Sequence, residues 1–434
     1  MKNSKKLLLG TATALLSFSA GAMEMEKPSG TPVVSDLTVK ISAFSHFQTG
    51  MRKQKNLTEK EKNVSAKRKT FAFNSESAMS LEVSNYVNDF KYGGKIVLVP
   101  TNKRKGGSFN GSHIFTETNY GRFEAGSPLP ASYKMQVDGH DIAAAPATNW
   151  SRYVDFSTED MMQKQSIEPS FAVVSDFFLD SKLATKLDNR NYSSEPARSI
   201  SYYTPKFALG QSSKVQVGVS YAPDSSNTGA EKHTKVSSGL SIRNINKDGT
   251  DRFEIDSSVR DAVSAGITLE QNFSDGIDLK VGLTGEYANA SGKATKFEND
   301  VEKESYKLSP LRTFNIGAIL NVGSMSYAGS FGSLGKSLTT PEFHKTGRST
   351  KYYTGTVAYK QGPFAASVSY FKSNQYENTV DAISIGTHYV MAPGFKPYVQ
   401  ISTFRLKGKP EFYPKLEKKK TRGTVALIGV KLSL

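Results

Sequence analysis

The sequence of 434 residues contains no cysteine. Small secreted domains are commonly stabilised by disulfides, and this class of scaffold is excluded because no bridge can form. A chain of this length is long enough to build a core without cross-links. The missing cysteine leaves open both an exported soluble protein and a membrane protein.

Long apolar runs are also missing, except at the start of the chain. There three lysines precede an apolar stretch over residues 7–20, which ends in the small-x-small pattern Ala20-Gly21-Ala22. We predict a signal peptide over residues 1–22 with cleavage between Ala22 and Met23. As an uncleaved anchor the stretch is short, because a membrane-spanning helix needs about 20 residues. The mature chain, 23–434, is predicted to be a single domain.

The chain has a mean hydropathy of −0.43, and 37% of its residues are hydrophobic. These values are typical of a soluble protein. They are equally typical of a transmembrane β-barrel, because only every second residue of each strand faces lipid. An exported soluble protein and an outer-membrane barrel are therefore the two classes to separate.

Motifs for metal binding or catalysis are absent from the sequence. The six histidines are scattered, with no pair at ligand spacing and no neighbouring cysteine. No G-x-S-x-G arrangement of a serine hydrolase occurs, and the glycines form no phosphate-binding loop. We expect no metal, no cofactor and no enzymatic activity.

Basic residues outnumber acidic ones, 56 to 40, for a net charge of +16. Loss of the three leader lysines leaves +13 on the mature chain. Such an excess suits nucleic acid, an acidic lipid surface or a path for anions. Export makes nucleic acid the least suitable partner, and we predict none.

Apolar and polar residues alternate with a period of two along much of the chain. Residues 214–221 read Lys-Val-Gln-Val-Gly-Val-Ser-Tyr, so the valines lie on one face and Gln216, Gly218 and Ser220 on the other. The segments 277–289 and 421–434 repeat the pattern. A period of two with one apolar face indicates a half-buried strand.

Sixteen strands are predicted in this way. They cover 37–48, 71–87, 90–100, 112–119, 121–127, 198–206, 213–221, 261–272, 277–289, 311–321, 325–332, 351–361, 364–373, 379–390, 395–406 and 421–434. Seven connections are short and rich in turn-forming residues, and the connections between these turns are longer and charged. An even strand number with short turns on one rim and long loops on the other is the layout of bacterial outer-membrane barrels. We predict an all-β, 16-stranded antiparallel transmembrane β-barrel.

Three stretches resemble motifs of one family. Residues 198–210 resemble a "Ser-Ile-x-Tyr-x-(Ser/Thr)-Pro-x-Phe-x-Gly" strand, 119–126 a "Phe-Gly-x-Leu-x-x-Gly" turn and strand, and 385–395 a "Gly-x-x-Tyr-x-Leu-x-Pro-Gly" hairpin. The chain thus resembles the Gram-negative general porins of the alphaproteobacterial type. It departs from them at Leu434, where the family usually ends in phenylalanine, although the alternating apolar positions before it are intact.

The resemblance implies more than the fold. It implies a homotrimer in the outer membrane of a Gram-negative bacterium, in contact with outer-membrane lipid and lipopolysaccharide. It also implies a water-filled channel for passive diffusion of ions and small hydrophilic solutes. In such a porin the third long loop folds back into the barrel and narrows it.

The connection over residues 127–197 fits this third loop. Its 71 residues make it far longer than any other connection, and it carries ten acidic and six basic residues, a net charge of −4. The rest of the mature chain then carries +17. An acidic loop against a wall with inward bases would produce a transverse field that favours dipolar solutes.

Strand alternation selects the side chains that line the predicted pore. Asp138 and Asp141 lie early in the loop and are expected at the narrowest point. The inward acids are Glu82, Glu124, Glu270, Asp278 and Glu286. The inward bases are Lys40, Arg122, Lys214, Lys280, Lys360, Lys396 and Lys431.

Basic clusters at 52–69, 103–105 and 407–422 belong to the long loops outside the cell. They suit either the phosphates of surface glycolipid or the gathering of anions at the pore mouth. Two other functions stay open: a barrel with a plugged lumen that acts as an adhesin or structural anchor, and a porin selective for an anion such as phosphate. The mixed signs of the inward residues favour general diffusion with at most a mild anion preference.

Overall fold

The computed structural model describes residues 37–55, 70–87, 89–99, 109–154, 197–224, 237–243, 252–256, 258–274, 276–299, 301–338, 349–375, 378–407 and 420–434. Its two helical segments are α2 (Ala131–Met135) and the 3-10 turn η1 (Asn149–Tyr153). Within these ranges no helix is long and apolar enough to cross a membrane. The strands of the main sheet are β1 (Thr38–Lys55), β2 (Phe71–Val87), β3 (Phe90–Leu98), β4 (Phe109–Thr118), β5 (Gly121–Gly126), β6 (Ser199–Tyr203), β7 (Phe207–Ala208), β8 (Ser213–Asp224), β11 (Val259–Ser274), β12 (Ile277–Ala290), β15 (Leu311–Val322), β16 (Met325–Gly335), β17 (Thr350–Gln361), β18 (Phe364–Gln375), β19 (Asn378–Tyr389), β20 (Phe395–Lys407) and β21 (Lys420–Ser433).

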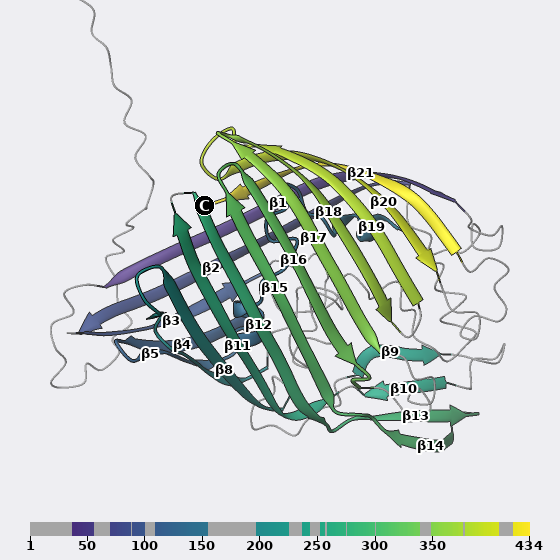
Figure 1. The fold of residues 1–434 in the computed structure, drawn as a ribbon. Helices are drawn as coiled ribbons and strands as arrows, with labels where there is room; N and C mark the ends of the chain where they lie inside the picture. Colours follow the sequence, from purple (N-terminus) through teal and green to yellow (C-terminus); the bar gives the residue numbers. More distant parts are fainter. Residues whose placement is uncertain are drawn as a thin grey trace, which may run out of the picture.

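These strands close into a barrel (Figure 1). β1 pairs antiparallel with β2 on one side and with the last strand, β21, on the other. Each remaining strand pairs antiparallel with its neighbours, and β6 and β7 both pair with β8 as two parts of one interrupted strand. The barrel therefore has sixteen strand positions, which confirms the predicted fold class.

The interruption lies within the segment 198–206, for which the sequence predicts a single strand. Pro205 has no N–H to offer the sheet, so the ladder breaks beside it. The N–H of Thr204 still donates to Val217 O at 2.9 Å, and Gln216 Nε2 donates to Thr204 O at 3.0 Å. A polar side chain thus replaces one rung of the ladder.

The two rims of the barrel differ in their connections. On the rim that holds both described ends of the chain, neighbouring strands are joined by tight turns in which Gly276 (φ 80°) and Gly323 (φ 55°) adopt the left-handed conformation. We call this the short-turn rim. The opposite, long-loop rim carries a second sheet of four strands, β9 (Ser237–Arg243), β10 (Arg252–Asp256), β13 (Lys293–Glu298) and β14 (Val301–Lys307), beyond the barrel strands (Figure 1). The sequence prediction missed this sheet, because its strands are short and lie in charged connections.

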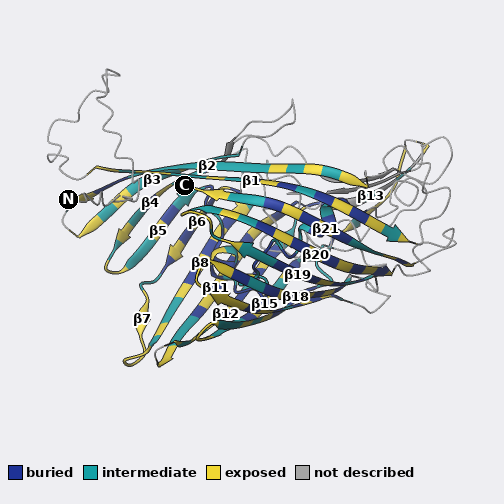
Figure 2. Cartoon of the chain, turned by 90° about the horizontal axis from the view of Figure 1, so that it is seen from above, coloured by how far each residue is buried: buried dark blue, intermediate teal, exposed yellow. Residues whose placement is uncertain are grey.

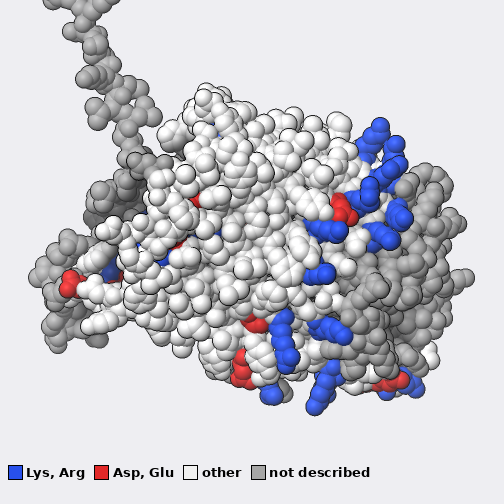
Figure 3. Space-filling view, viewed as in Figure 1, with Lys and Arg blue, Asp and Glu red and all other residues white. Residues whose placement is uncertain are grey.

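The outer face of the barrel is apolar. Exposed and buried residues alternate along the strands (Figure 2), and the exposed ones are mostly aliphatic or aromatic. Toward the short-turn rim the outward aromatics include Phe90, Phe123, Tyr202, Tyr327, Phe364 and Tyr389, and toward the long-loop rim Phe73, Tyr221, Tyr287, Phe314, Tyr353 and Tyr370. Two aromatic girdles around an aliphatic band are the signature of a surface that faces lipid. Figure 3 shows one such face almost without charge between its ends.

The inner face is polar and rich in hydroxyl groups. The strand register places Ser220 opposite Ser264, Ser330 opposite Thr354, and Ser384 opposite Ser402, all on the side facing away from the apolar belt. All six side chains are buried because the chain itself occupies part of the lumen beside them. The alternation that produces a lipid-facing outer surface thus also produces a hydrophilic interior.

Candidate channel and its inward loop

The third long connection begins and ends at one place on the long-loop rim. Gly126, the last residue of β5, lies directly opposite Ser199, the first residue of β6. After Gly126 the chain turns inward, and the N–H of Ser127 donates to Ser112 O at 2.7 Å. The described part of the loop, 127–154, then follows the inner wall from β8 around to β1 and β2. We call this segment the inward loop.

Hydroxyl groups of the wall hold the backbone of the inward loop. Ser220 Oγ accepts a hydrogen bond from Ala131 N–H at 2.8 Å, and Ser264 Oγ accepts one from Ser132 N–H at 2.7 Å. The same pattern continues along the wall with Thr354 accepting from Gly139, Ser367 accepting from Ala144, and Ser384 donating to the carbonyl of Ala147. These bonds satisfy backbone groups that are buried between loop and wall.

Glycines on the inner face let the loop lie close to the wall. A Cβ atom at Gly218 would lie 2.6 Å from Sδ of Met135, and one at Gly282 would lie 2.7 Å from Cγ2 of Val137. Both distances are too short for a real contact. A glycine inside a strand often marks such a close approach, and here it leaves room for Met135 at the end of α2 and for Val137 just after it.

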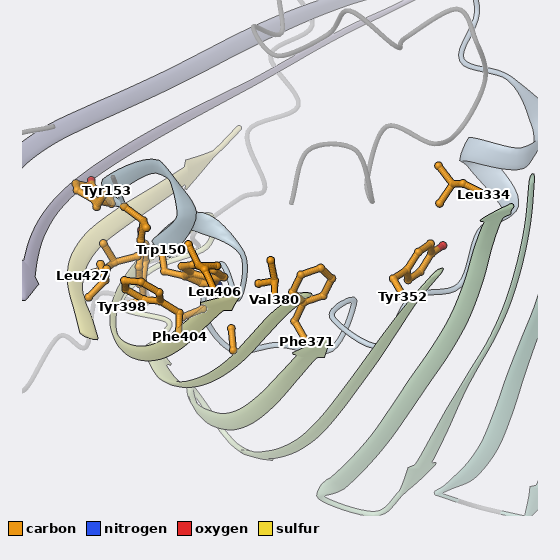
Figure 4. Close-up of a cluster of buried hydrophobic side chains, with 14 residues drawn as sticks. Trp150, Tyr153, Leu334, Tyr352, Phe371, Val380, Tyr398, Phe404, Leu406 and Leu427 are labelled. Carbon is orange, nitrogen blue, oxygen red and sulfur yellow. The ribbon is translucent and has the colours of Figure 1, made fainter. Parts of the chain in front are cut away.

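The far end of the inward loop packs on an apolar part of the wall (Figure 4). Trp150 is 2% exposed, and its ring stacks on Phe404 with centroids 5.2 Å apart and planes 11° from parallel. Tyr153 and Val154 are buried in the same cluster, against Leu427 of β21. This cluster holds η1 against β20 and β21.

The two acids predicted at the narrowest point have different surroundings. Asp138 is only 5% exposed, and its carboxylate accepts hydrogen bonds from Thr354 Oγ1 at 3.2 Å and Ser330 Oγ at 3.3 Å. Its carboxylate therefore faces the wall between β16 and β17 and fastens the loop there. Asp141 is exposed, although its carboxylate accepts the N–H of Asp138 at 2.9 Å. Of the two, Asp141 presents its charge to solvent.

Arg122 and Glu124 lie together on the inner face of β5. Glu124 is 2% exposed, pairs with Arg122 Nε at 2.9 Å and with the ammonium of Lys134, and lies 4.0 Å from His113 Nε2. Burial lowers the pKa of Lys134 in α2 below its ordinary value, and the negative charge of Glu124 opposes this effect. Arg122 also reaches Glu117 at 3.2 Å. This cluster joins α2 to the wall through charge.

The six predicted lysines occupy one end of the lumen. Register places all of them on the inner face and near the short-turn rim, and all except Lys431 are exposed. Because their neighbours along each strand belong to the lipid-facing surface, these side chains are exposed to the interior. They are Lys40, Lys214, Lys280, Lys360, Lys396 and Lys431.

These lysines do not form one site but several. Lys396 lies directly opposite Lys431, with no acid between them. Lys214 and Lys280 flank Glu270, whose carboxylate also binds Lys206 Nζ at 2.7 Å.

Acids accompany some of the lysines. Lys40 lies opposite Glu82, which is 3.8 Å from Lys95 Nζ. Asp278 faces the interior near the same rim, whereas Glu286 lies deeper and bonds to the Ser132 hydroxyl. The excess of positive charge is thus concentrated on β17, β20 and β21.

Several predicted features lie outside the described residues. These are the signal peptide with its cleavage at Ala22 and Met23, eight of the ten acids of the third loop, and most of the basic clusters. The described residues contain no group of three or more histidine, cysteine or acidic side chains arranged to hold a metal.

Sequence reasoning missed the residues that seat the loop. They are the inward serines, threonines and glycines, which carry no charge and do not stand out beside the charged candidates. The signal is nevertheless present, because Gly218, Gly266 and Gly282 occupy polar-face positions of predicted strands. A glycine at such a position weakens the strand. Its presence there usually indicates that another segment of the backbone lies close to the strand.

A closed barrel with an apolar belt, a polar interior and a loop bound inside it defines a bacterial transmembrane β-barrel. A family model described as Gram-negative porin matches residues 11–409. An uncharacterized protein of Rickettsia bellii is 40% identical over 449 residues, and one of Rickettsia felis is 41% identical over 448; each alignment covers 99% of both chains. The chain belongs to the Gram-negative porin family, and it is a protein of the outer membrane.

A solved structure supports the fold independently of sequence. The chain is similar to the anion-selective porin from Comamonas acidovorans with a TM-score of 0.52, covering 92% of this chain and 100% of that one. Only 13% of the aligned residues are identical, so the likeness concerns the fold alone.

Proposed function

We propose that this porin is a water-filled channel for the passive diffusion of ions and small hydrophilic solutes, and that it performs no catalysis. The observation that carries the proposal is the set of exposed lysines on the inner face of a closed wall whose outer face is apolar. Charged ammonium groups need water or a counter-charge. Side chains such as Lys360 and Lys396 therefore favour a hydrated lumen over a plugged one.

The inward loop supports the same proposal. Over its described residues, 127–154, it lies along the wall and is bound to it at many points. We propose that Asp141, Arg122 and the six lysines line the solute path. Asp138 and Glu124 are buried against the wall and act on that path as positioning groups, because both hold the loop in place.

We also propose export through the signal peptide at residues 1–22 and assembly as a homotrimer. The outer face of β1 and β2 favours a protein contact at its middle, where Ser45 and Ser77 share a hydrogen bond of 3.0 Å instead of large aliphatic side chains. Cross-linking of the refolded protein in detergent tests the assembly. A single band at the mass of one chain would argue against the trimer.

A mild preference for anions follows from the lysines on β20 and β21. The double substitution Lys396→Gln and Lys431→Gln removes two adjacent positive charges from the lumen. We expect it to lower the permeability ratio of chloride over potassium by roughly twofold. Reversal potentials under a salt gradient measure this ratio.

The matched control removes two lysines from the outer face. Lys351 and Lys372 lie on outward positions of β17 and β18, so Lys351→Gln with Lys372→Gln should leave the permeability ratio unchanged. An equal shift in the permeability ratio of both double variants would mean that the lumenal position of Lys396 and Lys431 has no special effect on selectivity.

Liposome swelling tests the passage of neutral solutes. Liposomes that contain the refolded mature protein should swell in isotonic sugar solutions, fastest for a pentose and progressively more slowly for larger oligosaccharides. Liposomes with the protein fully inserted that do not swell even in the pentose would favour an adhesin or structural anchor. Swelling without dependence on solute size would indicate membrane damage rather than a pore.

A further inference from the structure

The turn η1, at the far end of the inward loop, is attached to the wall by polar contacts as well as by its apolar cluster. Asn149 Nδ2 donates to Gln48 Oε1 at 2.9 Å, and the same oxygen accepts the hydroxyl of Tyr398 at 2.8 Å. That hydroxyl lies 2.7 Å from His46 Nε2 (Figure 4 shows Tyr398 below η1). Gln48, Tyr398 and His46 are 0%, 3% and 4% exposed, so this chain of bonds is shielded from solvent.

A second contact attaches the other end of η1. Arg152 Nη1 forms an ion pair with the carboxylate of Glu76 on β2. The same carboxylate lies 3.9 Å from Nδ1 of His46, its cross-strand partner. The imidazole of His46 is therefore the point where both attachments meet, of which one leads to Asn149 and the other to Arg152.

The hydrogen bonds around His46 fit a neutral imidazole. The Tyr398 hydroxyl has a single hydrogen and donates it to Gln48, so the bond between the hydroxyl and His46 is donated by Nε2. A neutral imidazole carries a proton on only one of its ring nitrogens, which leaves Nδ1 bare. The carboxylate of Glu76 is then available to Arg152.

A proton on His46 would bring a third positive charge to this site. Lys431 lies directly opposite His46 on β21, and both Lys431 and Arg152 act on the ring electrostatically. Among the residues that the structure describes, the titratable groups facing the ring from the neighbouring elements are Glu76 on β2, Tyr398 on β20, Lys431 on β21, and Arg152 and Tyr153 on η1. One carboxylate would thus have to balance three cations in a site with little water.

This repulsion couples the protonation of His46 to the docking of η1. Docking brings the guanidinium of Arg152 close to the ring and disfavours its protonated form. Coupling between two equilibria is reciprocal, so a proton on the ring disfavours docking by the same factor. The undocked state then binds one proton more, and docking weakens as the pH falls below ~6.5, by up to about tenfold per pH unit.

We propose that His46 is a pH-sensing positioning residue of the inward loop. Neutral His46 keeps η1 on the wall, and protonation of its ring in acid releases η1 toward the lumen. The released segment would interrupt the current through the channel at acid pH. That consequence rests on the proposed channel function, whereas the release of η1 does not.

The fluorescence of Trp150 tests the proposal, because Trp150 is the single tryptophan of the chain and stacks on Phe404 when η1 is docked. In the refolded protein in detergent, the emission should shift reversibly to longer wavelength between about pH 7.5 and about pH 4.5, as the indole passes into water. His46→Gln should keep the short-wavelength emission throughout. The matched control is His113→Gln, on β4 beside the α2 end of the loop, which should respond to pH like the unsubstituted protein.

Glu76→Gln is a second variant, which keeps the histidine. It removes the counter-charge of Arg152, so the emission should be shifted to longer wavelength already at neutral pH. Unsubstituted emission of Glu76→Gln at neutral pH would contradict the proposal.

Three further results would overturn it. One is an unsubstituted protein whose emission does not change over this pH range, and another is an equal shift in His46→Gln. The third is a shift accompanied by loss of the β-sheet circular dichroism, since acid would then unfold the barrel instead of releasing η1. None of these measurements uses the channel current, so a failure here is separate from any failure of the channel proposal.

Discussion

Removal of the third loop is expected to raise the single-channel conductance roughly twofold or more, because a 16-stranded barrel without it encloses a wide aqueous lumen. The excision replaces residues 128–196 with a short turn. The geometry allows this, since Gly126 and Ser199 already lie opposite one another as neighbouring strand ends. Planar-bilayer recordings of the refolded variant in potassium chloride give the conductance.

The barrel should survive the excision at a lower stability. Its wall keeps every strand pairing, but Phe404, Leu427 and their apolar neighbours lose the cover of Trp150. A control that excises the β13–β14 hairpin, 293–307, removes chain beyond the strand ends and should change the conductance much less (Figure 1). An excised loop variant that folds and conducts like the full chain would show that the third loop does not narrow the channel.

Substitution of Trp150 by alanine is expected to release the far end of the inward loop. The ring is almost completely buried and stacks on Phe404, and truncation of a buried tryptophan costs about 3–5 kcal/mol. Applied to loop docking, about 3 kcal/mol raises the undocked population roughly hundredfold. Hydrogen exchange of residues 144–154 should accelerate accordingly, and the channel current should show frequent brief interruptions.

Trp150→Phe is the matched control for this prediction. It keeps an aromatic ring over Phe404 and should remain close to the unsubstituted protein in exchange rate and current noise. If the alanine variant exchanged at the unsubstituted rate, the apolar cluster would not be what fixes this end of the loop. The hydrogen bonds at Asp138 and along the wall would then carry the docking alone.

The barrel itself could be predicted from the sequence because its determinants are local. Period-two alternation locates each strand, and the same alternation assigns Lys214, Lys280 and Lys396 to the inner face, where the strand register also places them. The predicted strand boundaries differ from those of the structure where the alternation is interrupted or becomes weak. Pro205 interrupts one predicted strand, and β1 extends to Lys55 because alternation continues weakly into a charged segment.

The seating of the loop could not be predicted, because it depends on pairs that are distant in the sequence. Asp138 and Thr354 are 216 positions apart, and nothing in the local sequence around either residue indicates the other. Charge alone suggests that Asp138 faces the lumen. In the structure the surrounding hydroxyl groups bind its carboxylate to the wall, and they leave Asp141 exposed. The uncharged inward residues therefore determine which acidic side chains are exposed to the lumen.

Basic side chains are concentrated at opposite rims on the inner and outer faces of the barrel. Inward lysines are concentrated near the short-turn rim, whereas outward arginines and lysines are concentrated at the long-loop rim. The first group borders the path of solutes and the second borders the apolar belt.

Single-channel recording of the refolded full-length mature protein in a planar bilayer tests whether the lumen is open and hydrated. An open lumen in a homotrimer should give stable current steps in groups of three, a linear relation between current and voltage, and weak selectivity for chloride over potassium. A bilayer that stays sealed although the protein is demonstrably inserted would contradict an open lumen.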